Sequence, residues 1–562
     1  MLSRSDALEA MTSDRFDVVV IGGGITGAGV ALDAASRGYS VALVERDDYA
    51  VGTSSRSSKM VHGGLRYLQN FDLGLVREAL LERQLMVQLA PHLVYPTPFL
   101  IPTLGDDRRD RRYSVGLNMY DVMATTRVGR SRRDRQAREQ AEDYWAPDRH
   151  RTIPGDEVTE LVPALASQKP SSAYLFYDCQ TDDVRLVLTV LGEAERFGAV
   201  FVNDAEVTGL LEKGGGADGV ACVDAASGER FEVRADNVVN ATGVWADRIR
   251  PEEVVDEEDV PRISPSRGTH VTLSLETLPV TGAACIVPAG ESRTIFALPW
   301  YGSALVGTTD NDYDGDIAHV EPSMSDIEYL LDALNSFFEL TLGPGDLTGA
   351  YAGVRPLIST GDPRKSVDIS RKAELYETSS GLLTITGGKL TTWRRMARQV
   401  VDRMVEREGR EAPCRTGDIP LGMSASPDDL ELPEGLAEAD LPEGALDQLA
   451  FRYGYAARNV LKVAGDQRDL AAPIVDGRPD LIAEAVIAAR LEQARSVGDV
   501  LLRRTRLGVL AAPQLRDATS VMPVAEAMGG ELGWDKRRIK REAEAWVEIA
   551  RAEGVDPAAA VS

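Results

Sequence analysis

Short apolar runs and a helical pattern alternate at the start of the chain. Residues 16–21 and 41–44 are rich in β-branched residues and predict buried strands. Between them, the small residues of 28–37 predict a helix that ends at Gly38. This strand–turn–helix–strand order predicts the edge of a doubly wound sheet.

The middle of the chain mixes helical and strand patterns. Residues 75–90 are rich in Leu and Glu and predict an amphipathic helix. Residues 170–250 return to α/β character, and 262–360 show short strands between Gly and Pro turns. We expect an antiparallel sheet over 262–360, interrupted by a helix at 325–338 with Ser325 as its N-cap.

The composition changes towards the end of the chain. Residues 418–444 are rich in Pro, Asp and Glu and indicate a linker. Residues 445–551 are mostly helical in pattern, and 483–502 predict the plainest helix. No stretch reaches the roughly 20 apolar residues of a spanning helix, and residues 1–15 lack the apolar part of a secretory signal. We therefore expect a soluble, cytoplasmic protein with a helical C-terminal domain.

The chain is strongly acidic. Its 562 residues include 62 basic and 88 acidic side chains, a net charge of −26, which disfavours nucleic-acid binding. Only nine of the basic residues are Lys and 53 are Arg. Adaptation to concentrated salt and a GC-rich genome that favours Arg codons both explain this balance, and the sequence leaves the two open.

The cysteines and histidines give no sign of a metal site. The five histidines include no H-E-x-x-H pair. The cysteines form no C-x-x-C pair, which disfavours an iron–sulfur cluster, a zinc site and a disulfide scaffold. They lie far apart, at Cys179, Cys222, Cys285 and Cys414.

A glycine turn follows the first predicted strand. Gly22 permits the tight turn, Gly24 lets the backbone approach a pyrophosphate, and Gly27 allows close helix–strand packing. The start of the helix supplies amide donors and the positive end of its dipole. Glu45, at the end of the second strand, is placed to accept hydrogen bonds from ribose hydroxyls. Together these features predict a bound dinucleotide.

Three further segments favour FAD over NAD. Residues 240–243 follow an apolar pair as a strand-to-loop turn, and 204–210 suit a strand beside the adenine. A second glycine turn, 387–392, opens a predicted helix at 393–407, and its amides would face the flavin and stabilise negative charge on the reduced ring. Separate approaches to one elongated cofactor favour FAD. The predicted contacts are Val207, Ala241, Thr242, Gly243, Gly388 and Thr391.

Residues 52–68, Gly-Thr-Ser-Ser-Arg-Ser-Ser-Lys-Met-Val-His-Gly-Gly-Leu-Arg-Tyr-Leu, form the most informative segment. It resembles that of the FAD-dependent glycerol-3-phosphate dehydrogenases, amine-oxidase-like flavoproteins related to glycine oxidase. The resemblance covers most of 16–400, and 502–508 resembles the family's C-terminal helical domain. It continues at 77–80, 90–93, 182–186, 307–310, 353–357 and 387–392. Within residues 52–68, the assigned cofactor contacts are Thr53, Ser54, Ser58, Lys59, His62 and Gly63.

The resemblance also implies a substrate pocket over the flavin. A phosphate dianion needs fixed cations, so we assign Arg371 and Lys389, helped by Tyr67, to the phosphate. His270 is the better acceptor for the hydroxyl proton, whereas Arg355 orients the substrate and stabilises charge. Taken singly, a lone Arg is usually a surface charge and a lone His a structural residue. The implied pocket residues are Arg66, Tyr67, His270, Arg355, Arg371 and Lys389.

The resemblance further implies a reaction and an electron acceptor. The substrate sn-glycerol 3-phosphate would be oxidised to dihydroxyacetone phosphate by hydride transfer to flavin N5. Electrons would pass to a quinone at the inner face of the cell membrane, directly or through partner subunits with iron–sulfur centres. The Arg-rich region 108–138, around the apolar island 115–124, is either a membrane-contacting surface or a domain-packing helix. A homodimer is left open.

Three alternatives belong beside this interpretation. An oxidase that passes electrons to oxygen and releases peroxide fits the same residues. A glycine-oxidase-like amine oxidase fits the fold but not the cationic pocket. The third alternative is a non-catalytic flavoprotein scaffold. The joint presence of Arg66, His270, Arg355, Arg371 and Lys389 argues against it.

The predicted fold class is α+β, with a Rossmann-like FAD-binding domain, an interleaved antiparallel-sheet substrate domain and a C-terminal helical domain. The FAD-binding domain takes residues 16–105, 181–261 and 351–412. An Arg-rich helical insert with a substrate-domain segment takes 106–180, and the substrate sheet takes 262–350. A linker at 413–444 leads to the helical domain at 445–562.

Overall fold

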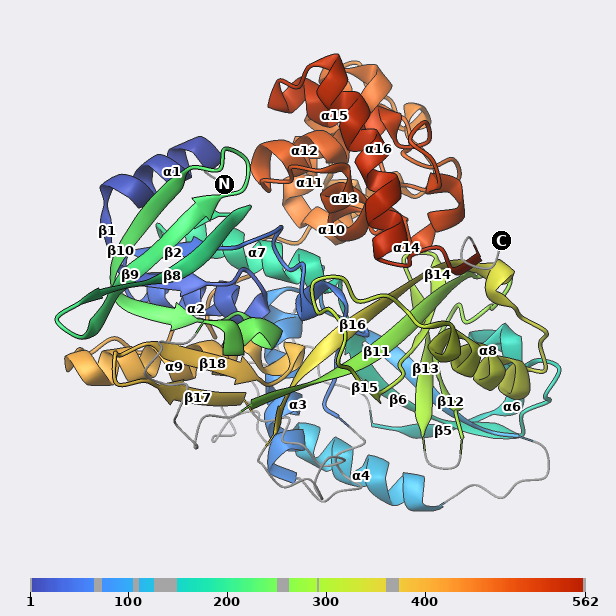
Figure 1. Ribbon diagram of the computed structural model, residues 1–562. Coiled ribbons are helices and arrows are strands. Elements are labelled where there is room, and N and C mark those ends of the chain that lie inside the picture. The colour runs from blue at the N-terminus through green and yellow to red at the C-terminus, as the bar shows by residue number, and fades with distance from the viewer. Residues whose placement is uncertain are drawn as a thin grey trace.

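Two sheets lie side by side in the computed structural model, and a group of helices packs across one end of both (Figure 1). This arrangement confirms the predicted α+β class with two sheet domains and a helical C-terminal domain. The structure describes residues 3–64, 73–104, 111–125, 149–249, 262–290, 293–359 and 373–558.

The first sheet is built around β1 (Arg15–Ile21), as the opening pattern predicts. β1 pairs in parallel with β2 (Val41–Val44) on one side and with β10 (Arg230–Asn240) on the other. The strand order is β17-β18-β10-β1-β2-β7, and β8 and β9 extend from β10 as a hairpin. The remaining strands are β7 (Val200–Val202), β8 (Ala205–Lys213), β9 (Gly216–Asp224), β17 (Ala373–Glu377) and β18 (Leu383–Gly387).

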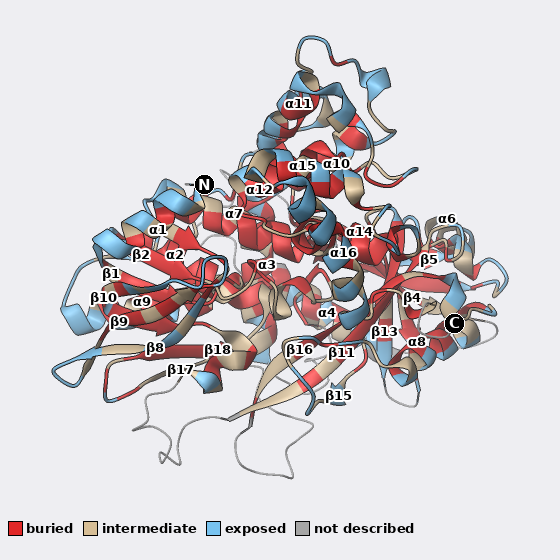
Figure 2. Ribbon diagram, turned by 45° about the horizontal axis from the view of Figure 1, so that its top comes forward, coloured by how far each residue is buried: buried red, intermediate tan, exposed pale blue. Residues whose placement is uncertain are grey.

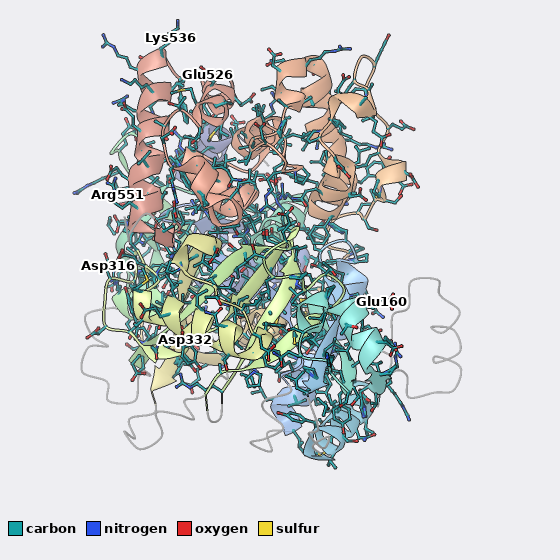
Figure 3. The ribbon with its side chains drawn as sticks, turned by 90° about the vertical axis from the view of Figure 1, so that its right-hand side faces the viewer. Glu160, Asp316, Asp332, Glu526, Lys536 and Arg551 are labelled. Carbon is teal, nitrogen blue, oxygen red and sulfur yellow. The ribbon has the colours of Figure 1, made fainter. Side chains whose placement is uncertain are left out.

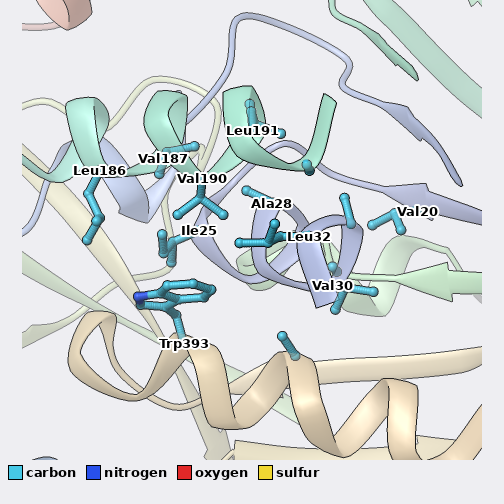
Figure 4. Packing of buried hydrophobic residues seen from close by; sticks show 14 of the residues in the cluster. Val20, Ile25, Ala28, Val30, Leu32, Leu186, Val187, Val190, Leu191 and Trp393 are labelled. Atoms are coloured by element: carbon cyan, nitrogen blue, oxygen red, sulfur yellow. The ribbon is translucent and has the colours of Figure 1, made fainter. Parts of the chain in front are cut away.

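Helices bury the central strands of this sheet on both faces. α2 (Ile25–Ser36) lies between α7 (Asp183–Arg196) and α9 (Trp393–Glu408), and Figure 4 shows Trp393 of α9 beside the apolar side chains of α2 and α7. A Cβ atom at Gly29 would come within 2.6 Å of the Trp393 ring, so a glycine permits this approach. The other face is covered in part by α1 (Arg4–Ser13), a helix that the sequence patterns did not predict.

The second sheet begins earlier in the chain than predicted. Its strand order is β15-β11-β14-β13-β12-β4-β6-β3, with β16 paired to β11 and β5 to β6. β3 (Met60–Val61) and β4 (Tyr95–Thr103) both precede residue 105, the predicted end of the first FAD-domain segment. β4 also pairs in parallel with β12, so the sheet is mixed and not wholly antiparallel. The other strands are β5 (Arg151–Pro154), β6 (Ser172–Gln180), β11 (Arg262–Ser274), β12 (Ala284–Pro288), β13 (Thr294–Trp300), β14 (Ser303–Gly307), β15 (Asn311–Asp312) and β16 (Leu347–Ser359).

The helix predicted within the second sheet is present, but its predicted cap was wrong. α8 (Met324–Phe338) begins after Ser323, whose Oγ accepts from the backbone amide of Asp326 at 3.2 Å. The Ser323 hydroxyl also accepts from Arg267 at 2.8 Å. Ser325 lies within the first turn instead. A sequence pattern does not separate two serines two residues apart, because the choice depends on this contact with β11.

The helix predicted at 483–502 is broken in the structure. α12 (Ala483–Leu491) stops early, and Gln493 adopts a left-handed φ of +54°. The Gln493 side chain accepts from the Tyr49 hydroxyl at 2.9 Å and donates to the Phe201 carbonyl at 3.0 Å. The break therefore places a side chain of the helical domain against the first sheet domain.

The remaining helices belong to the two sheet domains and to the helical C-terminal domain. Figure 2 shows that buried residues run from α2 and α7 into the helical domain, without an exposed layer between them. Charged side chains such as Glu160, Asp332 and Lys536 point outward (Figure 3). Within the described ranges, every helix is too short or too polar to cross a bilayer. These helices are α3 (Leu73–Leu89), α4 (Arg111–Thr125), α6 (Gly155–Leu161), α10 (Ala445–Tyr453), α11 (Ala457–Asp466), α13 (Val497–Asp499), α14 (Leu507–Leu510), α15 (Met522–Leu532) and α16 (Lys536–Ala552).

Candidate cofactor and substrate site

A cavity of about 540 Å³ lies where the carboxyl ends of β1, β2, β10 and β18 meet. Ligands in open α/β sheets bind at this edge, because the loops that follow parallel strands converge there. Segments far apart in the sequence therefore share one wall. Of the predicted contacts, the cavity brings together Gly22, Gly24, Glu45, Thr53, Ser54, Val207, Ala241, Thr242, Gly243, Gly388 and Lys389.

The glycine turn after β1 leaves the backbone open to a ligand. Gly22 has a φ of +106°, and a Cβ atom there would lie 2.8 Å from the carbonyl oxygen of Ala241. At Gly27 a Cβ atom would lie 1.9 Å from the Gly22 carbonyl, so this residue packs the turn and does not line the cavity. A side chain at Gly24 would crowd the Ser54 hydroxyl, 3.1 Å away. This cradle fits the pyrophosphate of a dinucleotide at the start of α2.

Glu45 lines the cavity with a carboxyl group that two amides hold in place. Its Oε2 accepts from the Gly23 amide at 2.6 Å and its Oε1 from the Asp47 amide at 3.0 Å. Burial nevertheless raises the pKa of Glu45 to about 7, because the ionised form loses more hydration than the two amides restore. The carboxyl is therefore poised between its two protonation states near neutral pH.

Arg46 and Trp245 are among the wall residues that were not predicted from the sequence. The Arg46 guanidinium lies 5.2 Å from the centre of the Trp245 ring, and both side chains line the cavity. Among the described residues, Trp245 Nε1 has no hydrogen-bond partner. Their places in the sequence could have indicated them, because Arg46 follows Glu45 and Trp245 comes two residues after Gly243.

Five other predicted contacts lie off the cavity wall: Ser58, Lys59, His62, Gly63 and Thr391. The His62 amide donates to the Thr391 hydroxyl at 3.2 Å, which joins the segment after β3 to the turn before α9. The Gly63 amide donates to the Tyr120 hydroxyl at 3.0 Å. These hydrogen bonds fix the segment after β3 and do not place its residues on the cavity wall.

Lys59 was predicted to contact the cofactor, but its side chain is buried off the cavity wall. Its side chain is 1% exposed, and Nζ lies 2.8 Å from Asp183 Oδ2 and 2.5 Å from the Ser55 carbonyl oxygen. Burial lowers the pKa of Lys59 to about 8, although Asp183 opposes the shift. The ammonium group therefore serves the packing of its own segment, while the left-handed φ of +58° turns it inward.

His270 lies on β11 with its ring held on two sides. Nε2 lies 2.9 Å from the Ser58 hydroxyl, and the ring stacks on Tyr351 with centroids 4.8 Å apart and planes at 11°. Among the described residues, Nδ1 has no hydrogen-bond partner. Burial holds the pKa of His270 well below its usual value, and the charges of Lys59 and Arg355 act in the same direction. The imidazole is therefore neutral, which leaves one of its ring nitrogens unprotonated.

Residues 307–310 bring Arg355 and His270 to one place. Arg355 donates to the Thr308 hydroxyl at 3.2 Å and forms an ion pair with Asp310 at 3.1 Å. A Cβ atom at Gly307 would come within 2.3 Å of the His270 ring, so glycine makes room for the imidazole. Residues 307–310 therefore make room for the His270 ring and hold the Arg355 side chain.

The structure describes only some of the residues that were predicted to bind the substrate. Lys389 lines the cavity, and so does Pro356, the residue after Arg355. Arg66, Tyr67 and Arg371 lie outside the described residues. Their assignment to the substrate remains a prediction.

The apolar island of the Arg-rich region forms α4. Leu117 and Tyr120 are buried, and the Tyr120 hydroxyl donates to Asp178 at 2.7 Å. Val115 and Val122 are exposed on the other face, and Tyr113 is exposed near the start of the helix. The buried face of α4 therefore packs against the rest of the protein. Only the exposed side chains of this helix could contact a membrane. Most of the flanking arginines lie outside the described residues.

Metal ligands are not gathered anywhere in the described part of the chain. No group of three His, Cys, Asp or Glu side chains there is arranged to hold an ion. The four cysteines are free thiols.

Comparison with known proteins gives consistent results along the chain. Residues 17–394 match the family described as FAD dependent oxidoreductase, and 386–539 match the C-terminal domain of alpha-glycerophosphate oxidase. The chain is 37% identical to Glycerol-3-phosphate dehydrogenase 2 of Mycobacterium tuberculosis, over 96% of this chain and 88% of that protein. It is 34% identical to the aerobic glycerol-3-phosphate dehydrogenase of Bacillus subtilis, over 90% of this chain and 89% of that protein. The crystal structure of glycerol-3-phosphate dehydrogenase from Bacillus halodurans complexed with FAD superposes with a TM-score of 0.74 at 27% identity, covering 98% of this chain and 97% of that one.

Proposed function

Because the chain belongs to the FAD-dependent glycerol-3-phosphate dehydrogenases of the FAD dependent oxidoreductase family, we propose that it oxidises sn-glycerol 3-phosphate to dihydroxyacetone phosphate. One observation carries this proposal: the 37% identity extends over 96% of the chain. The similarity therefore includes the helical domain and both sheets, and is not confined to a dinucleotide-binding core that many flavoproteins share.

The cavity supplies the groups that FAD needs. The glycine turn at residues 22–24 would hold the pyrophosphate at the start of α2, and Glu45 would accept from the adenosine ribose. The turn containing Gly388 presents the start of α9 to the flavin end. When bound, FAD supplies the acceptor, flavin N5, that takes the hydride from the substrate carbon.

The chain's own side chains manage the proton and the charge. His270 is neutral, so it has an unprotonated ring nitrogen, which takes the proton from the substrate hydroxyl as the hydride leaves the carbon that bears this hydroxyl. Arg355 holds the substrate oxygen and offsets negative charge that develops there. Lys389, with Arg371, Tyr67 and Arg66, binds the phosphate and the rest of the substrate.

The direct test is a spectrum of the oxidised holoenzyme under anaerobic conditions. Adding sn-glycerol 3-phosphate should bleach the flavin absorbance, and the product should be dihydroxyacetone phosphate. Glycerol at the same concentration, which lacks the phosphate, is the matched control. An unbleached spectrum with intact FAD would favour the non-catalytic scaffold.

Arg371 is assigned here to the substrate phosphate. Arg371→Ala should raise KM for glycerol 3-phosphate about tenfold to 100-fold, because a charge-assisted bond to phosphate contributes about 1.5–3 kcal/mol. Steady-state kinetics with FAD-saturated enzyme measures this. An unchanged KM would remove Arg371 from the phosphate site.

We propose a quinone as the electron acceptor, reached directly or through partner subunits at the inner face of the cell membrane. Lipid contact would use the exposed apolar side chains of α4, which are Tyr113, Val115 and Val122. Changing all three to Ser should abolish sedimentation with anionic vesicles, while flavin reduction stays the same. Unchanged sedimentation would assign α4 to domain packing alone.

A second candidate is an oxidase that passes the electrons to oxygen. The match of residues 386–539 to the C-terminal domain of alpha-glycerophosphate oxidase favours it. Parallel assays of peroxide release and of reduction of a soluble quinone analogue decide between the two. Stoichiometric peroxide with no quinone reduction would identify the oxidase.

A further inference from the structure

Arg506 enters the sheet domains from the helical C-terminal domain. It lies between the π-helical turn Val500–Arg504 and α14, with a left-handed φ of +68°. Its side chain is 2% exposed, and Nη2 lies 2.8 Å from Asp182 Oδ1. The same nitrogen donates to Asp183, more than 300 residues away in sequence. A guanidinium with two carboxylate partners is fixed in orientation as well as in charge.

Asp183 carries this contact to the segment 57–59, of which Ser57 lines the cavity. Its Oδ2 accepts from the Ser57 hydroxyl at 2.6 Å and from the Ser57 amide at 3.2 Å. Both carboxylate oxygens also contact Lys59 Nζ, at 2.8 and 3.0 Å. Asp183 therefore clamps residues on both sides of Ser58.

The clamped segment determines where the His270 ring lies. The Ser58 hydroxyl is 2.9 Å from His270 Nε2. The Ser57 carbonyl accepts from the Tyr351 hydroxyl at 2.8 Å, and the Tyr351 ring stacks on a face of the same imidazole. Both supports of the ring thus depend on the position of residues 57 and 58.

We propose that Arg506 is a positioning residue of the active site, which holds His270 in its reactive orientation through Asp183 and the Ser57–Ser58 backbone. The helical domain then contributes to the chemistry without touching substrate or cofactor. This inference rests on the proposed function only in assigning the proton transfer to His270. A displacement of about 1 Å in such a group can lower a rate about 100-fold.

The chain offers a matched control in Arg504. Arg504 ends the π-helical turn two residues before Arg506, is fully buried, and forms an ion pair with Asp48 at 2.6 Å. Arg504→Gln therefore also removes a buried ion pair between the helical domain and the first sheet domain. None of its described contacts reaches Asp183 or Ser57.

The kinetic test compares Arg506→Gln with Arg504→Gln in FAD-loaded, full-length enzyme. Arg506→Gln should lower the anaerobic rate of flavin reduction about tenfold to 100-fold. KM and FAD content should stay within about twofold of the wild type, since neither phosphate nor cofactor loses a contact. Arg504→Gln should leave the rate near that of the wild type. Equal losses in the two variants, or a rise in KM alone, would overturn the proposal.

A double-mutant cycle with Ser57→Ala tests the route. Ser57→Ala removes the hydroxyl that Asp183 holds and leaves every buried charge in place. If Arg506 acts through this bond, adding Ser57→Ala to Arg506→Gln should cost little further rate. Losses that multiply would place Arg506 outside the route. If Arg506→Gln does not fold, Arg506→Lys and Ser57→Ala decide, and a wild-type rate in both would contradict the proposal.

A measurement independent of turnover completes the test. The chain has five histidines, so the ring resonances of His270 in ¹⁵N-histidine-labelled holoenzyme can be assigned with a His270→Asn variant. They should shift in Arg506→Gln and not in Arg504→Gln. If the wild type fails to bleach with glycerol 3-phosphate, the proposed function fails, while this shift still tests the link from Arg506 to His270. Unshifted His270 resonances in Arg506→Gln would overturn it.

Discussion

Glu45 combines two opposing effects on one carboxyl group. The amides of Gly23 and Asp47 stabilise its ionised form, yet burial outweighs them and the pKa rises to about 7. Ribose hydroxyls that donate to this group would add stabilisation to the carboxylate alone. Binding of FAD should therefore favour loss of the proton, and affinity should increase with pH.

The expected change in FAD affinity follows from this linkage. With a pKa near 7 in the cofactor-free protein, the ionised fraction of Glu45 rises about tenfold between pH 6 and pH 8, and the association constant should rise by the same factor. Fluorescence titration of the apoprotein with FAD measures it. Glu45→Gln has no such proton to lose, so its affinity should be lower and flat over this range. A flat wild-type profile would mean that the ribose does not select the carboxylate.

His270 should act as a base over an unusually wide pH range. Because burial and the nearby cations keep its pKa well below 6.5, the ring stays unprotonated as the pH falls from 8 to 6, and its titration should cause no loss of rate there. His270→Asn should lower the rate of flavin reduction about 10²- to 10⁴-fold at constant FAD content.

His92 is the control for this substitution. It is a half-buried histidine whose pKa burial lowers to about 4, and it does not line the cavity. His92→Asn should leave the rate of reduction unchanged. A His270→Asn variant with the wild-type rate would assign proton removal to another group.

Residue types in motifs were easier to predict than side-chain directions. The glycines and Glu45 follow from local geometry, since a tight turn and a strand end fix their surroundings within a few positions. Lys59 does not, because its inward direction depends on a left-handed backbone and on Asp183, 124 residues away. Arg506 carries no local signal either, as its partners are more than 300 residues distant.

At the scale of elements, the turn between β1 and α2 depends on a glycine inside the helix. A methyl group at Gly27 would lie 1.9 Å from the Gly22 carbonyl, so the turn would have to open. Gly27→Ala should weaken FAD binding about tenfold or more, since overpacking of this kind costs about 1–3 kcal/mol. Gly192→Ala in α7 meets no atom within 4 Å and should raise stability by about 0.5–1 kcal/mol. FAD titration and thermal unfolding of both variants check the pair, and equal FAD affinity in the two would contradict the account.

Elements with a strong local pattern were found where the sequence placed them, and their ends were set by distant contacts. β1, β2 and α9 follow their apolar runs closely. α12 stops early because Gln493 bonds to Tyr49 and Phe201 in another domain. α1 has a weakly amphipathic sequence, so only its packing against the first sheet shows it as a helix.

At the scale of the molecule, buried ion pairs join the helical domain to the first sheet domain. Asp48 binds Arg503 and Arg504, and Arg185 binds Glu492, with all of these side chains nearly buried. Such pairs are poorly screened by salt, whereas the charges on the surface are well screened. The two kinds of charge should therefore respond differently to ionic strength.

The net charge of −26 gives the last prediction. Repulsion between surface carboxylates weakens as the Debye length falls from about 20 Å at 20 mM salt to about 4 Å at 0.5 M, so the apparent Tm of the holoenzyme should rise by about 2 °C or more over this range of KCl. The buried pairs should hold the domains together throughout, so unfolding should remain a single transition. Activity that persists in multimolar KCl would favour salt adaptation as the reason for the acidity, and its loss there would favour a codon bias. A Tm that falls between 20 mM and 0.5 M would mean that surface ion pairs outweigh the repulsion.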